Sequence, residues 1–175
     1  MTTYIALLRG INVGGHRKIP MATLRQLCEA LGWQKVQTYI QSGNLVFQSD
    51  DVPESLAVAL QQAILNHFGF EVVVIIRTAG ELMQVLEAYP WRDEAPEAQQ
   101  YFTLLANEPD PSLPPVVVDA PEKYHLDGLT VYLFCANGYG QTKMGNDFFE
   151  RKLKQKATTR NRNTIVKLIE MAQNG

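Results

Sequence analysis

The sequence predicts an α+β fold in two halves, residues 1–77 and residues 78–175, which form either two small domains or one structural unit. Three observations predict this class. Short apolar runs that are typical of strands alternate with segments of helical periodicity. Turns rich in glycine and asparagine separate them. A proline-rich stretch interrupts the second half, and further strands and helices follow it.

The first half begins with a strand, a loop and a helix. The apolar run Tyr4–Leu8 predicts the strand, and the glycine-rich residues 9–18 predict an irregular loop. Pro20 suits the first turn of a helix, apolar residues then recur at helical spacing, and Gly32 is a typical helix stop.

A hairpin, a second helix and a further strand complete the first half. Strands are predicted at Val36–Ile40 and Asn44–Gln48, joined at Gly43, which supplies the positive φ of a tight turn. A helix follows from Pro53 to Gly69, and the β-branched run Val72–Ile76 predicts a central strand. The resulting order, β-α-β-β-α-β, is that of a ferredoxin-like arrangement.

The second part is predicted to be an α/β half that contains an antiparallel hairpin. Thr78 and Glu81 stand in capping-box positions at the start of a helix. A strand follows at Tyr101–Ala106, and five of the nine prolines lie in the connection 109–121. Asp127-Gly128 is a strong hairpin signal, and two helices complete the order α-β-β-β-α-α. No short-period repeat is evident, and a loose similarity of the two halves as α/β layers stays open.

The composition indicates a cytoplasmic protein. No segment approaches the roughly 20 consecutive apolar residues of a membrane span, and the N-terminal residues carry no secretory signal pattern. The three histidines and the two cysteines show no metal-ligand spacing, so neither a metal nor a cofactor is predicted. Cys28 and Cys135 stand among apolar residues and are predicted to lie in the core.

The loop Gly10–Gly15 nearly matches a phosphate-binding P-loop. However, His16 stands where that motif has its lysine, and Arg17 stands where it has a hydroxyl group. A weaker hypothesis remains: the backbone N–H groups of the loop form an anion-binding nest, with Arg9, Arg17 and Lys18 beside it. The alternative is a plain loop whose glycines satisfy only the geometry of the chain.

The polar segment Thr158–Thr164 precedes the last predicted helix, with Asn161 or Asn163 as the expected N-cap. Arginine at this end of a helix opposes the helix dipole, so a negative group is expected nearby. A bound phosphate would meet both the arginines and the free N–H groups of the first turn. Carboxylates from the acidic middle of the chain would serve equally well, and the sequence does not choose between the two.

Charge is unevenly distributed along the chain. Residues 1–49 carry five basic residues and one acidic residue, residues 50–127 carry three and fourteen, and residues 128–175 carry eight and three. The basic end suggests an alternative function, non-enzymatic nucleic-acid binding through a C-terminal basic face. That face would include Lys143, Arg151, Lys152, Lys154, Lys156, Arg160 and Arg162. The acidic middle suggests a third function, a protein-interaction module that meets a basic partner through Glu94 and Glu97.

Several longer strings resemble one bacterial family. They are Tyr4–Gly15, Thr38–Asn44, Thr142–Lys143 with Phe149–Leu153, and Ala157–Asn161, and they look like the domain-of-unknown-function family 1697. The resemblance spans nearly the full chain. It implies a pair of α/β units of ferredoxin-like character, without an established activity. Two positions depart from the family pattern: His16 stands where relatives often carry lysine, and Arg162 where they often carry tryptophan.

We hypothesise that three polar segments converge on one pocket between the two halves, which binds a phosphorylated small molecule or a nucleotide. The expected ligand-binding residues are Arg9, Gly10, Asn12, Gly14, Gly15, Lys18, Gln41, Ser42, Asn44, Lys143, Thr159, Arg160 and Asn161. If such a pocket shields the ligand from water, Ser42 or Lys143 could take part in chemistry, but no base, metal or cofactor completes a mechanism. The sequence therefore leaves catalytic turnover and oligomeric state open.

Overall fold

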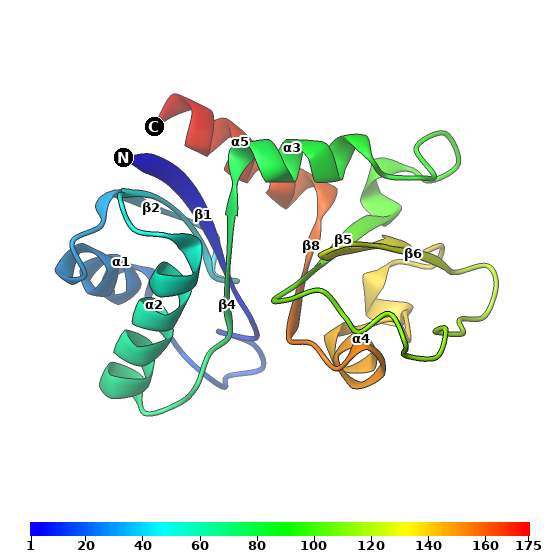
Figure 1. Cartoon of the computed structure of the whole chain (residues 1–175), viewed down its shortest axis with the longest axis horizontal. Helices are drawn as coiled ribbons and strands as arrows, with labels where there is room; N and C mark the ends of the chain where they lie inside the picture. Colours follow the sequence, from blue (N-terminus) through cyan, green and yellow to red (C-terminus); the bar gives the residue numbers. More distant parts are fainter. The chain divides into compact units, whose positions relative to one another are not determined.

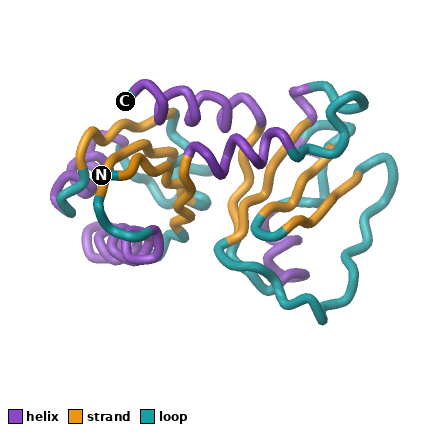
Figure 2. Tube along the Cα trace, turned by 45° about the horizontal axis from the view of Figure 1, so that its top comes forward, coloured by secondary structure: helices purple, strands orange, loops and turns teal.

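A computed structural model describes all residues of the chain, 1–175, and confirms the α+β class (Figure 1). The strands form two four-stranded antiparallel sheets (Figure 2). The chain divides into two compact units. Unit 1 consists of Met1–Met83 and Lys167–Gly175, and unit 2 consists of Gln84–Val166.

Unit 1 contains the element order β-α-β-β-α-β that the sequence predicts. Its elements are β1 (Thr2–Leu8), α1 (Met21–Ala30), β2 (Gln34–Tyr39), β3 (Asn44–Ser49), α2 (Pro53–Phe68) and β4 (Val74–Thr78). The strand order is β2-β3-β1-β4, and all neighbours are antiparallel. The boundaries agree with the sequence prediction to within about two residues, the usual uncertainty of such assignments.

The core of unit 1 forms where α1 and α2 pack on one face of this sheet. Leu24 and Cys28 of α1 and Leu60 of α2 are fully buried in the same cluster as alternate residues of β1. Trp33 stacks on Phe47 with their ring centroids 3.9 Å apart. Both helices end as expected, because glycine follows the last turn of each in the left-handed conformation, with φ of 87° at Gly32 and 78° at Gly69.

Unit 2 is built on a second sheet. Its regular elements, with the helices that continue into unit 1, are α3 (Ala79–Glu87), the short 3₁₀ turn η1 (Glu97–Gln99), β5 (Gln100–Leu105), β6 (Lys123–Asp127), β7 (Thr130–Phe134), the 3₁₀ turn η2 (Tyr139–Gln141), α4 (Asn146–Leu153), β8 (Ala157–Asn161) and α5 (Arg162–Asn174). The strand order is β6-β7-β5-β8, and neighbouring strands are again antiparallel.

The prediction for residues 158–161 was wrong, because these residues form strand β8 and not a loop before the last helix. Three of the five residues of β8 are threonine or arginine side chains that are at least partly buried. Threonine is β-branched and fits a pleated sheet, and Thr159 lies opposite Thr103 of β5 with their hydroxyl oxygens 2.7 Å apart. A strand stabilised by such polar pairs carries no apolar run, which is the signal that sequence analysis uses.

The two sheets follow the same plan. In each unit the first strand, β1 or β5, lies between the third strand, β3 or β7, and the last strand, β4 or β8. The register agrees as well, since Arg77 lies opposite Ile5 of β1 and Arg160 lies opposite Phe102 of β5. The chain therefore contains a structural repeat whose period is too long to stand out among short sequence motifs.

The residue after each of these arginines caps a helix. At the start of α3 the Thr78 N–H donates to the Glu81 carboxylate at 2.7 Å, and the Glu81 N–H donates to the Thr78 hydroxyl at 3.2 Å. At the start of α5 the Thr164 N–H donates to the Asn161 side-chain oxygen at 2.8 Å. The capping box is confirmed, and Asn161 is the N-cap of the two candidates.

One connection differs between the units. Helix α1 lies between the first and second strands of unit 1, whereas the corresponding residues of unit 2, 106–122, contain five prolines and no helix. We call residues 106–122 the proline segment; it is the longest loop of the chain (Figure 2). Its middle is anchored on β6, because Val116 is buried and its carbonyl oxygen accepts a hydrogen bond from the Tyr124 hydroxyl at 2.8 Å.

Both cysteines are expected to resist thiol reagents in the folded protein. Cys28 and Cys135 are fully buried and unpaired, and burial raises the pKa of each thiol to about 12. At pH 8 the reactive thiolate is then only about one part in ten thousand of each cysteine. We expect a disulfide reagent such as Ellman's reagent to label neither residue in buffer and both in guanidinium chloride. Rapid labelling of the native protein would contradict this burial.

The same pKa shifts predict a loss of stability at alkaline pH. An unfolded cysteine loses its proton near pH 8.5, whereas the folded thiols keep theirs until about pH 12. The unfolded state therefore binds fewer protons between these values, and the free energy of unfolding falls as the pH rises above about 8.5. Urea denaturation of the protein with both cysteines changed to alanine provides the control, because its pH dependence in this range should be shallower.

Candidate functional site

The glycine-rich loop after β1 has an unusual backbone. Gly10, Asn12 and Gly14 have left-handed φ values of 68°, 55° and 58°, whereas the residues between them do not. Gly15 and Arg17 are also left-handed, with φ of 76° and 51°. Gly14 and Gly15 are the two central residues of a tight turn, which the His16 N–H closes by donating to the Val13 carbonyl oxygen at 3.0 Å.

The side chain of Asn12 holds this loop in place. Its amide nitrogen donates to the carbonyl oxygens of Ile19 at 3.0 Å and of Gln41 at 2.8 Å, and its oxygen accepts the Ile19 N–H at 2.8 Å. The Asn12 N–H donates to the Arg17 carbonyl oxygen at 3.0 Å and closes the loop on itself. Asparagine tolerates the left-handed conformation better than most residues. Asn12 can therefore adopt its φ of 55° and still form these side-chain hydrogen bonds.

The turn between β2 and β3 lies directly beside the loop. The Leu8 N–H donates to the Gly43 carbonyl oxygen at 2.8 Å. Asn44 is fully buried, and its amide nitrogen donates to the Tyr39 carbonyl oxygen and to the Ser42 hydroxyl, both at 2.9 Å. The loop and the turn thus meet where Asn12 contacts Gln41, and they carry nine of the expected ligand-binding residues, those from Arg9 to Lys18 and from Gln41 to Asn44.

Donors remain available at the tip of this loop. The N–H groups of Gly14 and Gly15 have no acceptor within the protein, and both residues are exposed. Lys18 is exposed and forms no ion pair. Arg17 is already engaged, because its guanidinium donates to the Glu71 carbonyl oxygen and lies 5.9 Å from the Phe70 ring centroid. Among the charged side chains at the tip, Lys18 is therefore the cation without a protein partner.

The four candidates in unit 2 have structural contacts of their own. Thr159 donates to the Asn146 side-chain oxygen at 2.6 Å, and Asn161 caps α5. Arg160 is buried and donates to the Thr158 hydroxyl at 2.7 Å and to the Thr159 carbonyl oxygen at 3.0 Å. Burial lowers the pKa of Arg160 to about 10, an effect that Tyr139 partly offsets, so the side chain stays charged at neutral pH. Lys143 is exposed.

The sequence predicts a negative group near the two arginines at the start of α5, Arg160 and Arg162. For Arg162 this group is a carboxylate. The Arg162 guanidinium nitrogen Nε lies 3.7 Å from the Glu97 carboxylate, and another of its nitrogens donates to the Gln100 side-chain oxygen at 3.2 Å. Glu94, the other acidic residue considered for a protein partner, is paired with Lys123 at 2.6 Å. Both glutamates are thus used within unit 2.

Sequence analysis missed Arg77. This buried arginine occupies the position in β4 that Arg160 occupies in β8, and burial lowers its pKa, an effect that Glu81 partly offsets. The signal was present, because each arginine immediately precedes the capping residue of a helix. It could not be recognised as long as β8 was interpreted as a loop.

The structure contains no cluster of three or more His, Cys, Asp or Glu side chains that could hold a metal ion. Among its helices, none combines the length and the apolar character that crossing a membrane requires.

Comparisons with known proteins agree with the fold. The family model described as "Protein of unknown function (DUF1697)" matches residues 1–132. No curated protein matches the chain by sequence. A solved structure of a conserved bacterial protein, SP0830 from Streptococcus pneumoniae, is similar over 98% of both chains, with a TM-score of 0.70 and 27% sequence identity.

Replacing Gly43 by alanine is expected to destabilise the protein by about 2–5 kcal/mol, the sum of a left-handed alanine and an overpacked contact. Gly43 has φ of 89°, and an added Cβ atom would lie 2.8 Å from the Leu8 Cβ and 2.9 Å from the Ile11 Cδ1. Gly10→Ala is the matched control, because Gly10 is also left-handed but has open space around it. In urea denaturation, the Gly10→Ala control should lose only about 1–2 kcal/mol of unfolding free energy. Equal losses in the two variants would show that the close approach of Leu8 and Ile11 to Gly43 is unimportant.

Proposed function

Because this chain belongs to the DUF1697 family, whose function is unknown, we propose a function from the geometry of unit 1: the loop 9–18 binds the phosphate group of a small ligand or nucleotide. The observation that carries the proposal is the combination of a left-handed backbone with unused N–H groups at Gly14 and Gly15. Exposed N–H groups without an acceptor in the protein are able to donate to an anion.

The residues of the loop have separate roles in this proposal. Asn12 joins the loop to the turn through its hydrogen bond to Gln41, and its two hydrogen bonds with Ile19 hold the loop closed. Gly14 and Gly15 supply N–H donors, and Lys18 supplies a positive charge that no carboxylate neutralises. A loop that is already fixed loses little conformational freedom when the ligand binds, which favours affinity.

The polar residues outside the loop extend the proposal. Ser42 and Gln41 lie in the adjacent turn, where the Ser42 hydroxyl accepts a hydrogen bond from Asn44. That Lys143, Thr159, Arg160 and Asn161 of unit 2 contact the same ligand stays a prediction. We assign no catalytic step to any of these residues.

The phosphate site is tested by thermal shift and calorimetry with inorganic phosphate, a sugar phosphate and AMP. We expect each binding compound to stabilise the protein, by about 2.7 kcal/mol at one hundred times its dissociation constant. Lys18→Ala should weaken binding about two- to fivefold, the range of an exposed charge pair.

Lys167→Ala serves as the charge-matched control for this experiment. Lys167 belongs to α5 and pairs only with Glu170, three residues along the same helix. Its loss should leave the affinity for phosphate unchanged. No thermal shift with any of the three compounds, or equal effects of Lys18→Ala and Lys167→Ala, would rule out the loop as the site.

A second candidate function, nucleic-acid binding, is favoured by the end of α4. Arg151, Lys152, Lys154 and Lys156 are all exposed, and none of them forms an ion pair. Such unpaired cations release counterions from a nucleic-acid backbone on binding. The four residues lie within six positions of one another, at the end of α4 and directly after it.

Nucleic-acid binding at this surface predicts a steep salt dependence. The logarithm of the affinity for a short duplex should fall linearly with the logarithm of the salt concentration, with a slope of about −0.9 for each phosphate neutralised. Changing Lys152, Lys154 and Lys156 together to alanine should reduce the slope by about 3 in a fluorescence anisotropy titration. Affinity that does not depend on salt would exclude this function.

A further inference from the structure

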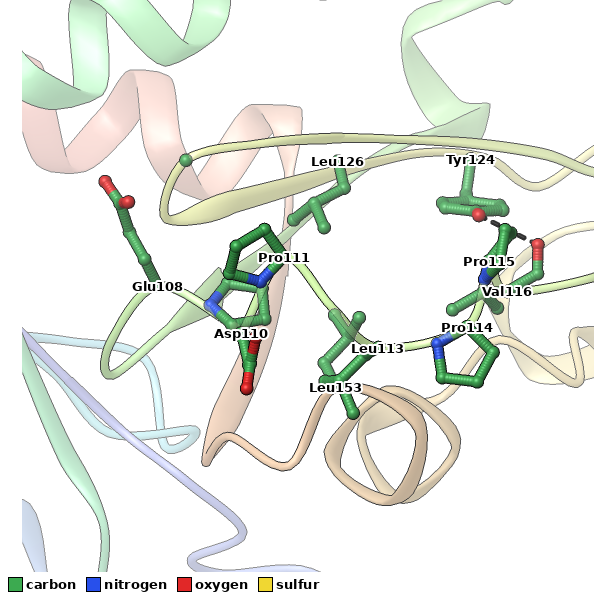
Figure 3. A pocket seen from close by; sticks show the side chains of 12 residues that line it. Glu108, Asp110, Pro111, Leu113, Pro114, Pro115, Val116, Tyr124, Leu126 and Leu153 are labelled. Atoms are coloured by element: carbon green, nitrogen blue, oxygen red, sulfur yellow. Dashed lines mark hydrogen bonds between the residues drawn. The ribbon is translucent and has the colours of Figure 1, made fainter.

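Unit 2 contains a hollow that the anion site does not use. It has a volume of about 320 Å³, within the range of small-molecule sites and about twice the volume of a protein cavity that takes up benzene. Its lining comes from the proline segment, from β6 and the turn after it, and from the last residue of α4 (Figure 3).

The hollow follows from the difference between the two units. In unit 1 the connection after the first strand contains α1, which buries Leu24 and Cys28 completely in the core. The proline segment stands in the same place in unit 2 but buries only Val116, at its anchor. Because proline fixes φ and donates no hydrogen bond, the segment spans this space without filling it.

The walls of the hollow are mostly apolar. Leu126 of β6 lies on one side, and Leu113 and Leu153 lie on the other (Figure 3). Tyr124 stands at one end, where its hydroxyl is already bonded to the Val116 carbonyl oxygen. A ligand in the middle of the hollow therefore meets hydrocarbon.

The opposite end of the hollow is acidic. Glu108 and Asp110 lie there (Figure 3), and none of the residues that line the hollow is basic. Asp110 accepts the Ser112 N–H at 2.8 Å, and this hydrogen bond lowers the pKa of its carboxyl group, so the charge is present at neutral pH. The charge of the rim is thus complementary to a cation and opposed to an anion.

We propose that this hollow binds a small organic cation with an apolar body, that is, an amine on a short alkyl or aromatic group. The apolar body lies between the three leucines, and the ammonium group lies beside Glu108 and Asp110. A neighbouring hollow of about 310 Å³, beyond the Val116 anchor, lacks this selectivity because Asp119, Glu122 and Lys143 give its lining both signs of charge.

Three compounds of similar shape test the proposal: 2-phenylethylamine, the neutral 2-phenylethanol and the anionic 3-phenylpropionate. Dissociation constants are measured by NMR titration, following the amide resonances of Tyr124 and Leu126. We expect the amine to bind about two- to fivefold more tightly than the alcohol, as exposed ion pairs allow, and the carboxylate to bind more weakly than the alcohol. Equal affinities for amine and carboxylate, or no movement of either resonance, would overturn the proposal.

Variants locate the site and its charge. Leu113→Trp, in a loop that tolerates substitution, should fill the hollow and weaken the binding of all three compounds by at least about tenfold.

Glu108→Gln combined with Asp110→Asn tests the charge of the rim and should reduce the affinity for the amine to that for the alcohol. Asparagine at position 110 keeps the side-chain oxygen that accepts the Ser112 N–H. The control Asp119→Asn removes a charge from the neighbouring hollow and should change the amine affinity by less than about twofold. Unaltered binding to Leu113→Trp would place the ligand elsewhere and refute the proposal.

Discussion

The side-chain amide of Asn12 is the constraint on which the candidate site of unit 1 depends. A run of left-handed residues costs free energy, about 1–2 kcal/mol for each residue other than glycine. The chain adopts this conformation because Asn12 exchanges two hydrogen bonds with Ile19 and makes a third to the turn that follows β2. Gly43 must then lack a side chain, because the loop and the first strand approach it closely. Loop, turn and strand are in this way fixed as one body before any ligand arrives.

Most elements could be predicted from the sequence because their signals are local. Apolar periodicity located α1 and α2, and glycine in the left-handed conformation ended both. The capping box of Thr78 and Glu81 needs only four residues to be recognised. By contrast, β8 is stabilised by Thr103, which lies 56 positions before its partner Thr159. The bond from Asn12 to Gln41 spans 29 positions. Such contacts depend on how the sheet pairs, and no short stretch of sequence shows that pairing.

The common plan of the two sheets gives the two proposed sites equivalent places. Each follows the central first strand of its unit, where the chain leaves the sheet before returning as the edge strand. In unit 1 this connection begins with Arg9-Gly10 and presents backbone donors; in unit 2 it begins with Ala106-Asn107 and continues with acidic residues and prolines. The same connection is thus rich in donors and positive charge in unit 1, and it carries acidic residues in unit 2. Such a difference is expected of a connecting loop, because a loop tolerates changes in sequence that leave the adjacent sheet intact.

Unit 1 is discontinuous, because it comprises Met1–Met83 and Lys167–Gly175. At the usual rate of translation, Lys167 leaves the ribosome's catalytic centre about 4–17 s after Met83. During that interval all strands of the first sheet have been synthesised, whereas the helical segment that belongs to the same unit has not, and the whole of unit 2 is being made. The ribosome therefore synthesises most of unit 1, then all of unit 2, and last the C-terminal residues of unit 1.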